Sequence, residues 1–136
     1  MTQGEKKLVI KDLCGRLPYG VIIQINDGLK GTYDSQLVQV FCDRVSCSVS
    51  ARNPLKECIC IDSVKPYLRP MSSMTEEEQN EYYKTFKAEP YGSGIGFIYV
   101  ESAKSFDWLN AHHFDYRGLI EKGLAISTEV FNPYKN

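Results

Sequence analysis

Apolar side chains recur every three or four positions at the start of the chain, which is the spacing of one helix face. The apolar positions are Val9, Ile10, Leu13, Cys14 and Leu17, and the charged positions among them are Lys6, Lys7, Lys11, Asp12 and Arg16. Pro18 then interrupts the pattern, because proline cannot continue the helical hydrogen-bond ladder. The spacing therefore predicts an amphipathic helix over residues 5–17.

From Val21 the period changes to two, which is the spacing of a strand with one buried face. The alternating segments are residues 21–26, 37–42, 44–50 and 57–62. In the second segment, strict alternation places Val38, Val40 and Cys42 on one face and Leu37, Gln39 and Phe41 on the other. Four such segments with short polar connections predict an antiparallel four-stranded meander or a small SH3-like barrel.

The rest of the chain mixes helical and extended patterns. Thr75 and Glu78 have the spacing of a capping box, which predicts a helix over 76–86. The other expected elements are a connector with two prolines over 63–74, a strand at 97–100, a short helix with Ser105 as its N-cap, a helix over 116–122 closed by Gly123, and a strand over 124–131. The fold class we expect is α+β, as one domain over residues 1–136 with an N-terminal helix, the meander or barrel, and then short helices and a late strand.

Composition narrows the classes of function. The chain has 136 residues, of which 43% are hydrophobic and 24% charged, and its net charge is −1. This balance is ordinary for a folded domain and argues against a general nucleic-acid binder. The first apolar run is too short for a signal-peptide core or a membrane span, so we expect the five cysteines to be thiols. We expect a protein partner, no membrane association and no cofactor, and the sequence leaves the oligomeric state open.

The most distinctive segment is residues 105–120, which contains four aromatic residues and both histidines. His112 or His113, hydrogen-bonded to an aspartate such as Asp115, could transfer protons, and Arg117 could hold a carboxylate or phosphate. Successive helical residues diverge by roughly 100°, however, so the two imidazoles would not face one site. We favour the simpler interpretation, in which the aromatic residues, Trp108 among them, pack the core.

A zinc site is the second candidate. Cys42, Cys47, Cys58 and Cys60 could supply four thiolates, but their spacings depart from the two-residue gap of zinc knuckles. Cysteines on strands more often behave as small apolar side chains. We therefore predict no metal site.

Two further segments carry alternative interpretations. Residues 92–96 are rich in glycine, yet they match neither phosphate-binding loop pattern, and a bulged entry to a strand explains them better. Lys65, Tyr67 and Arg69 lie on a stiff proline-flanked segment that, together with Trp108, could bind a partner. A rigid crossover from sheet to helix explains the same residues, and we favour it.

Three blocks of the chain resemble a family of short uncharacterised proteins encoded by Bacteroides-type gut bacteria and by their phages and mobile elements. The blocks are IKDLCGRLPYGV at 10–21, VKPYLRPMSSMT at 64–75 and DWLNAHHFDYRGLI at 107–120. The resemblance implies a cytoplasmic setting and a prophage-linked accessory role, and it supplies no activity. Two hypotheses of function follow: a non-catalytic protein-interaction or accessory module, and, as the alternative, a small hydrolase or transferase that uses a histidine with Asp115 and Arg117. An exposed aromatic patch would favour the first, and a cleft where these groups converge would favour the second.

Overall fold

The computed structural model describes residues 1–42, 46–92, 94 and 96–135, and it begins with the predicted helix. Helix α1 covers Gln3–Arg16. Thr2 is its N-cap, and a capping box joins Thr2 to Glu5, which satisfies N–H groups that the first helical turn leaves free. A short 3-10 turn, Leu17–Tyr19, ends the helix at Pro18 as expected.

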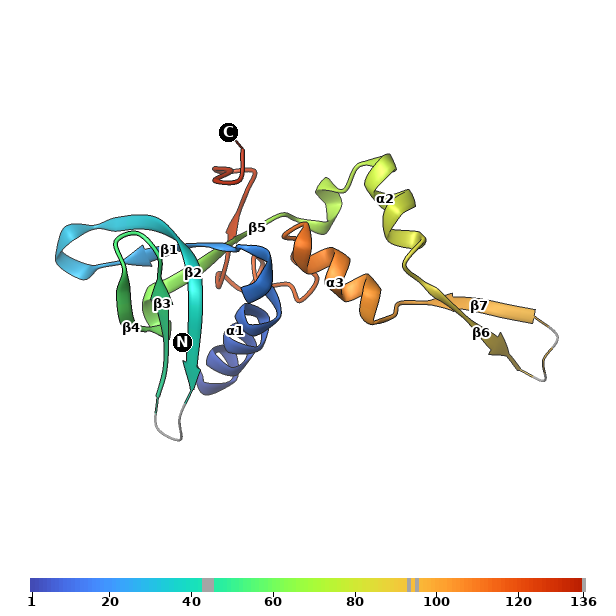
Figure 1. Ribbon diagram of the computed structural model, residues 1–136, viewed down its shortest axis with the longest axis horizontal. Coiled ribbons are helices and arrows are strands. Elements are labelled where there is room, and N and C mark those ends of the chain that lie inside the picture. The colour runs from blue at the N-terminus through green and yellow to red at the C-terminus, as the bar shows by residue number, and fades with distance from the viewer. Residues whose placement is uncertain (43–45, 93, 95, 136) are drawn as a thin grey trace.

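The predicted meander is confirmed, and it is part of a larger sheet (Figure 1). The strands of this sheet are β1 (Ile22–Asn26), β2 (Thr32–Cys42), β3 (Cys47–Ala51), β4 (Lys56–Cys60), β5 (Val64–Leu68) and β8 (Ile126–Ser127), in the order β4-β3-β2-β1-β5-β8. All neighbours are antiparallel except β5 and β8. Strand β5 corrects the prediction of a plain connector over 63–74, because its first half pairs with β1. The closed barrel stays a prediction.

Two β-bulges explain where the predicted strand faces are wrong. Leu37 is buried and Val40 packs against the same core, although strict alternation places them on opposite faces. The β2–β3 register shifts between Leu37 and Gln39, and one extra residue reverses the faces that follow it. A second register shift lies between Val49 and Ala51 in the β3–β4 pair, and there Val49, Ser50 and Ala51 are all buried, so the alternation of buried and exposed residues is lost. Residues 44 and 45 of the predicted strand 44–50 lie outside the described residues.

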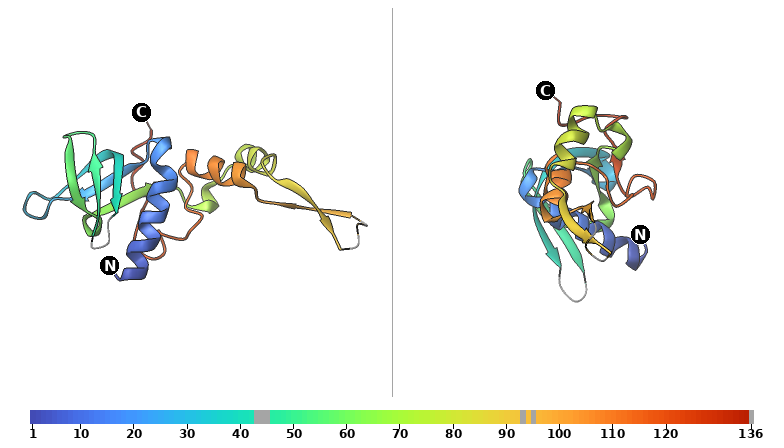
Figure 2. Two further views of the ribbon diagram at one scale, coloured as in Figure 1. Left: turned by 60° about the horizontal axis from the view of Figure 1, so that its bottom comes forward. Right: turned by 90° about the vertical axis from the view of Figure 1, so that its right-hand side faces the viewer.

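Helix α1 packs against the sheet, but its buried face differs from the predicted one (Figure 2). Val9 and Leu13 are buried as expected, whereas Cys14 is exposed. Asp12 and Arg16, predicted on the polar face, are completely buried. They are buried because they pair with each other and with the segment around Phe114, and the sequence gives no sign of that segment's position.

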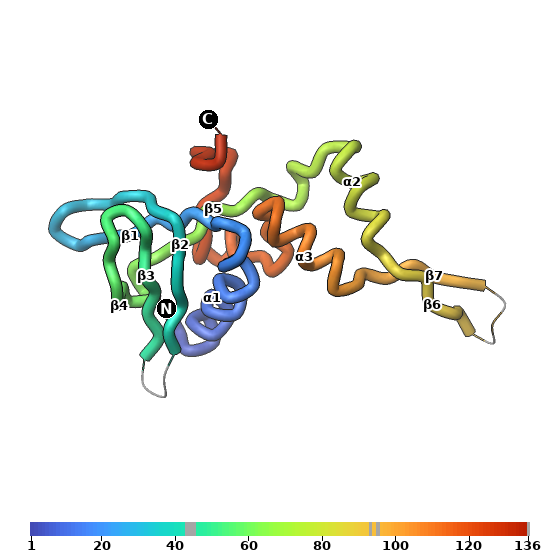
Figure 3. Tube along the Cα trace, in the orientation of Figure 1, coloured from blue at the N-terminus to red at the C-terminus, as the bar shows by residue number. Residues whose placement is uncertain are grey.

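The second half of the chain forms an arm (Figures 1 and 3). It comprises α2 (Glu76–Tyr83), β6 (Lys87–Tyr91), β7 (Gly96–Val100) and α3 (Ala103–Ala111). The capping box of Thr75 and Glu78 is confirmed, and α2 ends three residues before the predicted limit. Strands β6 and β7 form a separate antiparallel hairpin that projects away from the main sheet, with α2 and α3 at its base. The remaining 3-10 turns are Gly28–Lys30, Ile61–Ser63 and Met71–Ser73.

The C-terminal elements are shorter than predicted. Helix α3 starts after Ser102, so Ser105 is its third residue and not its N-cap. The predicted helix at 116–122 is a series of turns, because the Asp115 carboxylate accepts the N–H groups of Leu119 and Ile120 and holds a non-helical loop. The predicted strand 124–131 is reduced to β8. Among the described residues, no helix is long and apolar enough to cross a membrane.

Candidate functional site

The β6–β7 hairpin carries a row of exposed aromatic side chains. Pro90 lies opposite Phe97 and Ala88 opposite Tyr99, and directly opposed residues point to the same face of an antiparallel pair. The aromatic face of the hairpin, defined as Ala88, Pro90, Phe97 and Tyr99, therefore contains no charge. The exposed fraction is 71% for Phe97 and 72% for Tyr99. Side chains of this size normally bury most of their surface, so this face has the character of a docking surface.

The opposite face of the hairpin is mixed. Lys87 and Glu89 form an ion pair there, with 3.2 Å between Nζ and Oε1. Ile98 lies opposite Glu89, and Tyr91 follows on the same face. This face therefore has charged side chains that favour contact with water, whereas the aromatic face has none. The two faces are thus chemically distinct.

A hydroxyl network closes the base of the hairpin. The Ser102 hydroxyl donates to the Thr85 carbonyl over 2.7 Å, and the Thr85 hydroxyl donates to the Ser105 Oγ over 2.8 Å. The Ser105 Oγ also accepts the Ser102 N–H at 2.9 Å. Since Thr85 precedes β6 and Ser102 follows β7, these bonds hold the two ends of the hairpin together. They fix the direction in which the hairpin leaves the helices.

A small aromatic core anchors the arm. Tyr82, Leu109 and Phe114 are buried together, and Trp108 packs on them with its ring 5.7 Å from that of Phe114. Burial together with the nearby Glu101 carboxylate raises the pKa of Tyr82, which keeps the phenol neutral. Trp108, a predicted binding residue, is thus a half-buried part of the packing between α2 and α3.

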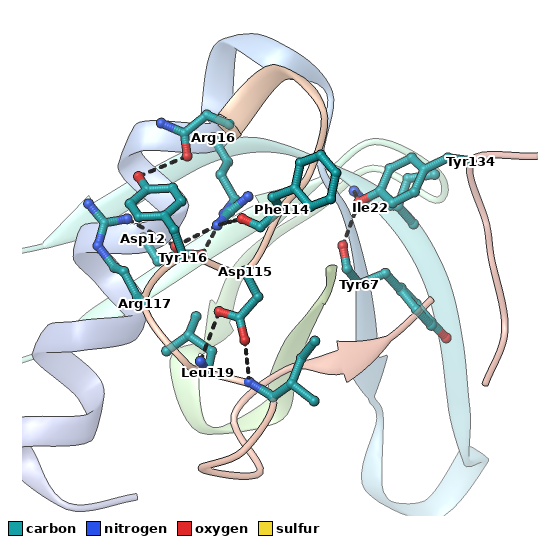
Figure 4. Close-up of polar contacts among 12 residues, drawn as sticks. Asp12, Arg16, Ile22, Tyr67, Phe114, Asp115, Tyr116, Arg117, Leu119 and Tyr134 are labelled. Atoms are coloured by element: carbon teal, nitrogen blue, oxygen red, sulfur yellow. Dashed lines mark hydrogen bonds and ion pairs between the residues drawn. The ribbon is translucent and has the colours of Figure 1, made fainter. Parts of the chain in front are cut away.

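The residues of the hydrolase hypothesis do not converge. Figure 4 shows that the Asp115 and Arg117 side chains have different partners. The Asp115 carboxylate accepts the N–H groups of Leu119 and Ile120, each at 2.9 Å. Arg117 donates to Asp12 at 3.0 Å. The His112 ring stacks on Trp108 and bonds the Trp108 carbonyl through Nδ1. No contact among these described residues joins an imidazole to Asp115 or Arg117, so the arrangement gives the proton-transfer hypothesis no support.

His113 is held in an unusual environment. Its backbone has a φ of 64°, and its ring stacks on Tyr134 with 3.8 Å between ring centroids. Burial, reinforced by the charge of Arg16, lowers the pKa of His113 to about 4, so the ring is neutral at pH 7. Both histidines line a cleft of about 680 Å³ that also includes Arg69. The positive φ turns the chain out of α3 at His113, whereas His112 still stacks on Trp108 one helical turn earlier.

The predicted binding residues of β5 are occupied by internal contacts. Tyr67 is only 3% exposed, and its hydroxyl donates to Asp34 at 2.7 Å. Burial and this carboxylate raise the pKa of Tyr67 to about 12. Arg69 donates two hydrogen bonds to Glu78, which hold the pKa of that carboxyl down at about 2. Lys65 is the exposed member of the set. A binding role for Lys65, Tyr67, Arg69 and Trp108 stays a prediction, and the structure does not bring them onto one open surface.

The cysteines are distributed over three places, namely helix α1 with the exposed thiol Cys14, the β2–β3 pair and strand β4. Cys42 and Cys47 are joined by a disulfide across the β2–β3 pair, so the expectation of thiols is wrong for these two. Cys58 and Cys60 are exposed thiols on the edge strand β4. Among the described residues, no three His, Cys, Asp or Glu side chains form a group that could hold a metal ion. The structure therefore does not assemble the four-cysteine alternative.

No family model, no curated protein and no solved structure matches this chain. Sequence reasoning placed a strand at 97–100 and missed its exposure. The sequence did contain a signal of this exposure. Phe97, Ile98 and Tyr99 give the strand apolar side chains on both faces, and the strand follows a glycine-rich turn. A strand of that composition is either buried on both sides or a docking element, and only the fold distinguishes the two.

Proposed function

We propose that this protein is a non-catalytic protein-interaction module and that the aromatic face of the β6–β7 hairpin receives the partner. The single observation that carries the proposal is the exposure of Phe97 and Tyr99 on an arm that projects from the body. A two-stranded hairpin is marginally stable alone in water, so a partner that covers it would supply burial that the chain lacks.

The chemistry of the face defines the partner. The aromatic face has no charge to pair with phosphates, and the net charge of the chain is −1, so a protein surface with an apolar pocket suits it better than nucleic acid. Aromatic anchors in a desolvated pocket supply most of the binding energy in such interfaces. A prophage-linked accessory role in the cytoplasm, implied by the sequence resemblance, belongs to this proposal.

A photo-crosslinking residue placed at position 97 tests the proposal in cells. The matched control places the same residue at Leu29, which is fully exposed on the 3-10 turn after β1. We expect a protein adduct of defined mass from position 97 and none from position 29. An adduct between two copies of the chain is recognised by its mass and does not count as a partner.

The crosslinked partner is then purified and titrated against the wild-type chain and the Phe97→Ser variant. Loss of an aromatic anchor should weaken binding by roughly 30-fold or more, with circular dichroism unchanged. Equal adducts from positions 97 and 29, or equal affinity of the two chains for the partner, would refute the proposal.

A further inference from the structure

The two outer edges of the hairpin differ in their capacity to accept another strand. Proline has no N–H, so a proline in an antiparallel ladder lies at a position whose N–H would point away from its partner strand. The Pro90–Phe97 pair is therefore a non-hydrogen-bonded pair. It follows that Pro90 blocks the outer edge of β6, because strands with proline on the edge resist further pairing.

The outer edge of β7 has no such block. Hydrogen-bonded and non-hydrogen-bonded pairs alternate along an antiparallel ladder. Because the Pro90–Phe97 pair is non-hydrogen-bonded, the Ala88–Tyr99 pair is too, and the N–H and C=O groups of Phe97 and Tyr99 point away from β6. Within the described part of the chain, β7 pairs with β6 alone. The segment from Gly96 to Val100 is uncharged and rich in aromatic and β-branched residues. An apolar strand with a free edge is a template for pairing with another strand.

We infer that β7 pairs with β7 of a second copy of this chain, antiparallel and centred on Ile98. In this register Ile98 faces its own copy, and Phe97 faces Tyr99 on both sides of the twofold axis. Because the outward groups belong to Phe97 and Tyr99, these two pairs are the hydrogen-bonded ones, and four backbone hydrogen bonds form across the axis. In this register the outward groups of Phe97 and Tyr99 all have partners within Gly96–Val100, whereas an axis centred on Phe97 or Tyr99 would pair one of the two residues with a position outside β7.

Charge and shape favour a second copy as the occupant. Every cross-strand neighbour between Gly96 and Val100 is apolar, so self-pairing sets no like charges against each other. The hairpin projects beyond the rest of the molecule, and antiparallel pairing leaves the two bodies at opposite ends of the joined arms (Figure 2). The resulting four-stranded sheet, β6-β7-β7-β6, ends at both edges in a blocked β6 strand, so assembly stops at the dimer.

The size of the contact sets its strength. Phe97, Ile98 and Tyr99 bury at most a few hundred Å² per copy, given about 150–250 Å² for each aromatic side chain. Stable interfaces bury about 1,200–2,000 Å² in total, so this dimer is a weak one that dissociates on dilution. The inference goes beyond the proposed function: it concerns the edge of the hairpin, whereas the partner binds the aromatic face, which doubles in area in the dimer.

Analytical ultracentrifugation of the full chain over a wide concentration range tests the association. We expect the mass to rise from 15.5 kDa toward twice that value. The Tyr99→Pro variant removes an outward N–H of β7 and should weaken association about tenfold or more relative to Tyr99→Thr, which retains the N–H. The matched control is Ala88→Pro, which lies opposite Tyr99 on the outer edge of β6 and should dimerise like the wild type.

A disulfide readout fixes the register. The Ile98→Cys change, made in a chain in which Cys14, Cys58 and Cys60 are serines, should give rapid disulfide dimers, because opposed Cα atoms of a non-hydrogen-bonded pair are about 4.5 Å apart. The Val100→Cys control should react far more slowly, because its neighbour across the axis is Gly96. A monomer at all concentrations, or a dimer that Tyr99→Pro leaves intact, overturns the inference. Partner binding at the aromatic face by a chain that stays monomeric at every concentration would overturn it while leaving the proposed function in place.

Discussion

Removing the carboxylate of Asp12 should destabilise the fold strongly. Asp12 and Arg16 are both completely buried, and Arg16 donates to the two carboxylate oxygens over 2.7 and 3.0 Å (Figure 4). Arg16 also donates to the Phe114 carbonyl at 2.7 Å, which ties α1 to the segment after α3. The Asp12→Ala change leaves a guanidinium in the core without its counter-charge. Breaking one side of a buried ion pair costs about 3–5 kcal/mol.

That cost is a large fraction of the total, since a domain is stable by about 5–15 kcal/mol. Urea unfolding, followed by Trp108 fluorescence and circular dichroism, should show a midpoint lower by roughly 1–3 M. Lys11→Ala, an exposed neighbour on α1, is the control and should change stability by less than about 0.5 kcal/mol. The double change Asp12→Leu with Arg16→Met removes both charges and should recover much of the loss. An Asp12→Ala midpoint within experimental error of the wild type would refute this account of the buried pair.

Two further predictions concern the C-terminal segment. Burial holds the folded pKa of His113 at about 4, below the ordinary value near 6.5, so the unfolded state binds more protons between these pH values and stability should fall as the pH drops from 6.5 to 4. His113→Phe should remove that part of the slope in urea midpoints measured across pH, and an unchanged slope would count against a buried neutral imidazole. Tyr134→Phe should cost about 1–3 kcal/mol, because the Tyr134 hydroxyl accepts the Ile22 N–H and donates to the Tyr67 carbonyl, each at 2.9 Å. A thermal midpoint equal to that of the wild type would contradict this.

The parts of the fold that local patterns specify were predictable. The capping box of Thr75, the stop at Pro18 and the period-two strands all depend on residues close in sequence, and each prediction is confirmed. The bulge beside Leu37 was not predictable, because an inserted residue leaves the alternation before and after it intact. Strand β5 was missed because its prolines suggested a connector. Pro66 nevertheless lies opposite Ile23 of β1. On its other side β5 has only the two residues of β8 as partners, and these pair with Tyr67 and Leu68, so Pro66 needs no partner for an N–H there.

The candidate site depended on information that the sequence does not contain. The charges of α1 read as a solvated face, yet Asp12 and Arg16 are buried, because the distant segment around Phe114 and Arg117 supplies their partners. The histidine block was one candidate for chemistry beside the favoured interpretation of core packing; in the structure Trp108 and Phe114 pack together, and the chain turns out of α3 at His113. Strand β7 reads like any apolar strand, and its exposure follows only from the projection of the hairpin.

The contacts that hold the N-terminal helix, the sheet and the C-terminal segment together therefore differ in kind from those of the hairpin. Buried ion pairs and long-range hydrogen bonds such as Tyr134 to Tyr67 join the N-terminal helix, the sheet and the C-terminal segment, and these tie residues far apart in sequence. The hairpin has contacts of the opposite kind, because its strands pair with each other and its hydroxyl network closes only its own base. This arrangement is the basis of our proposal that another molecule covers the arm, because a two-stranded hairpin alone is only marginally stable in water. In that proposal the hydrogen-bonded base sets where the molecule would bind, and the aromatic face and the β7 edge set what would bind.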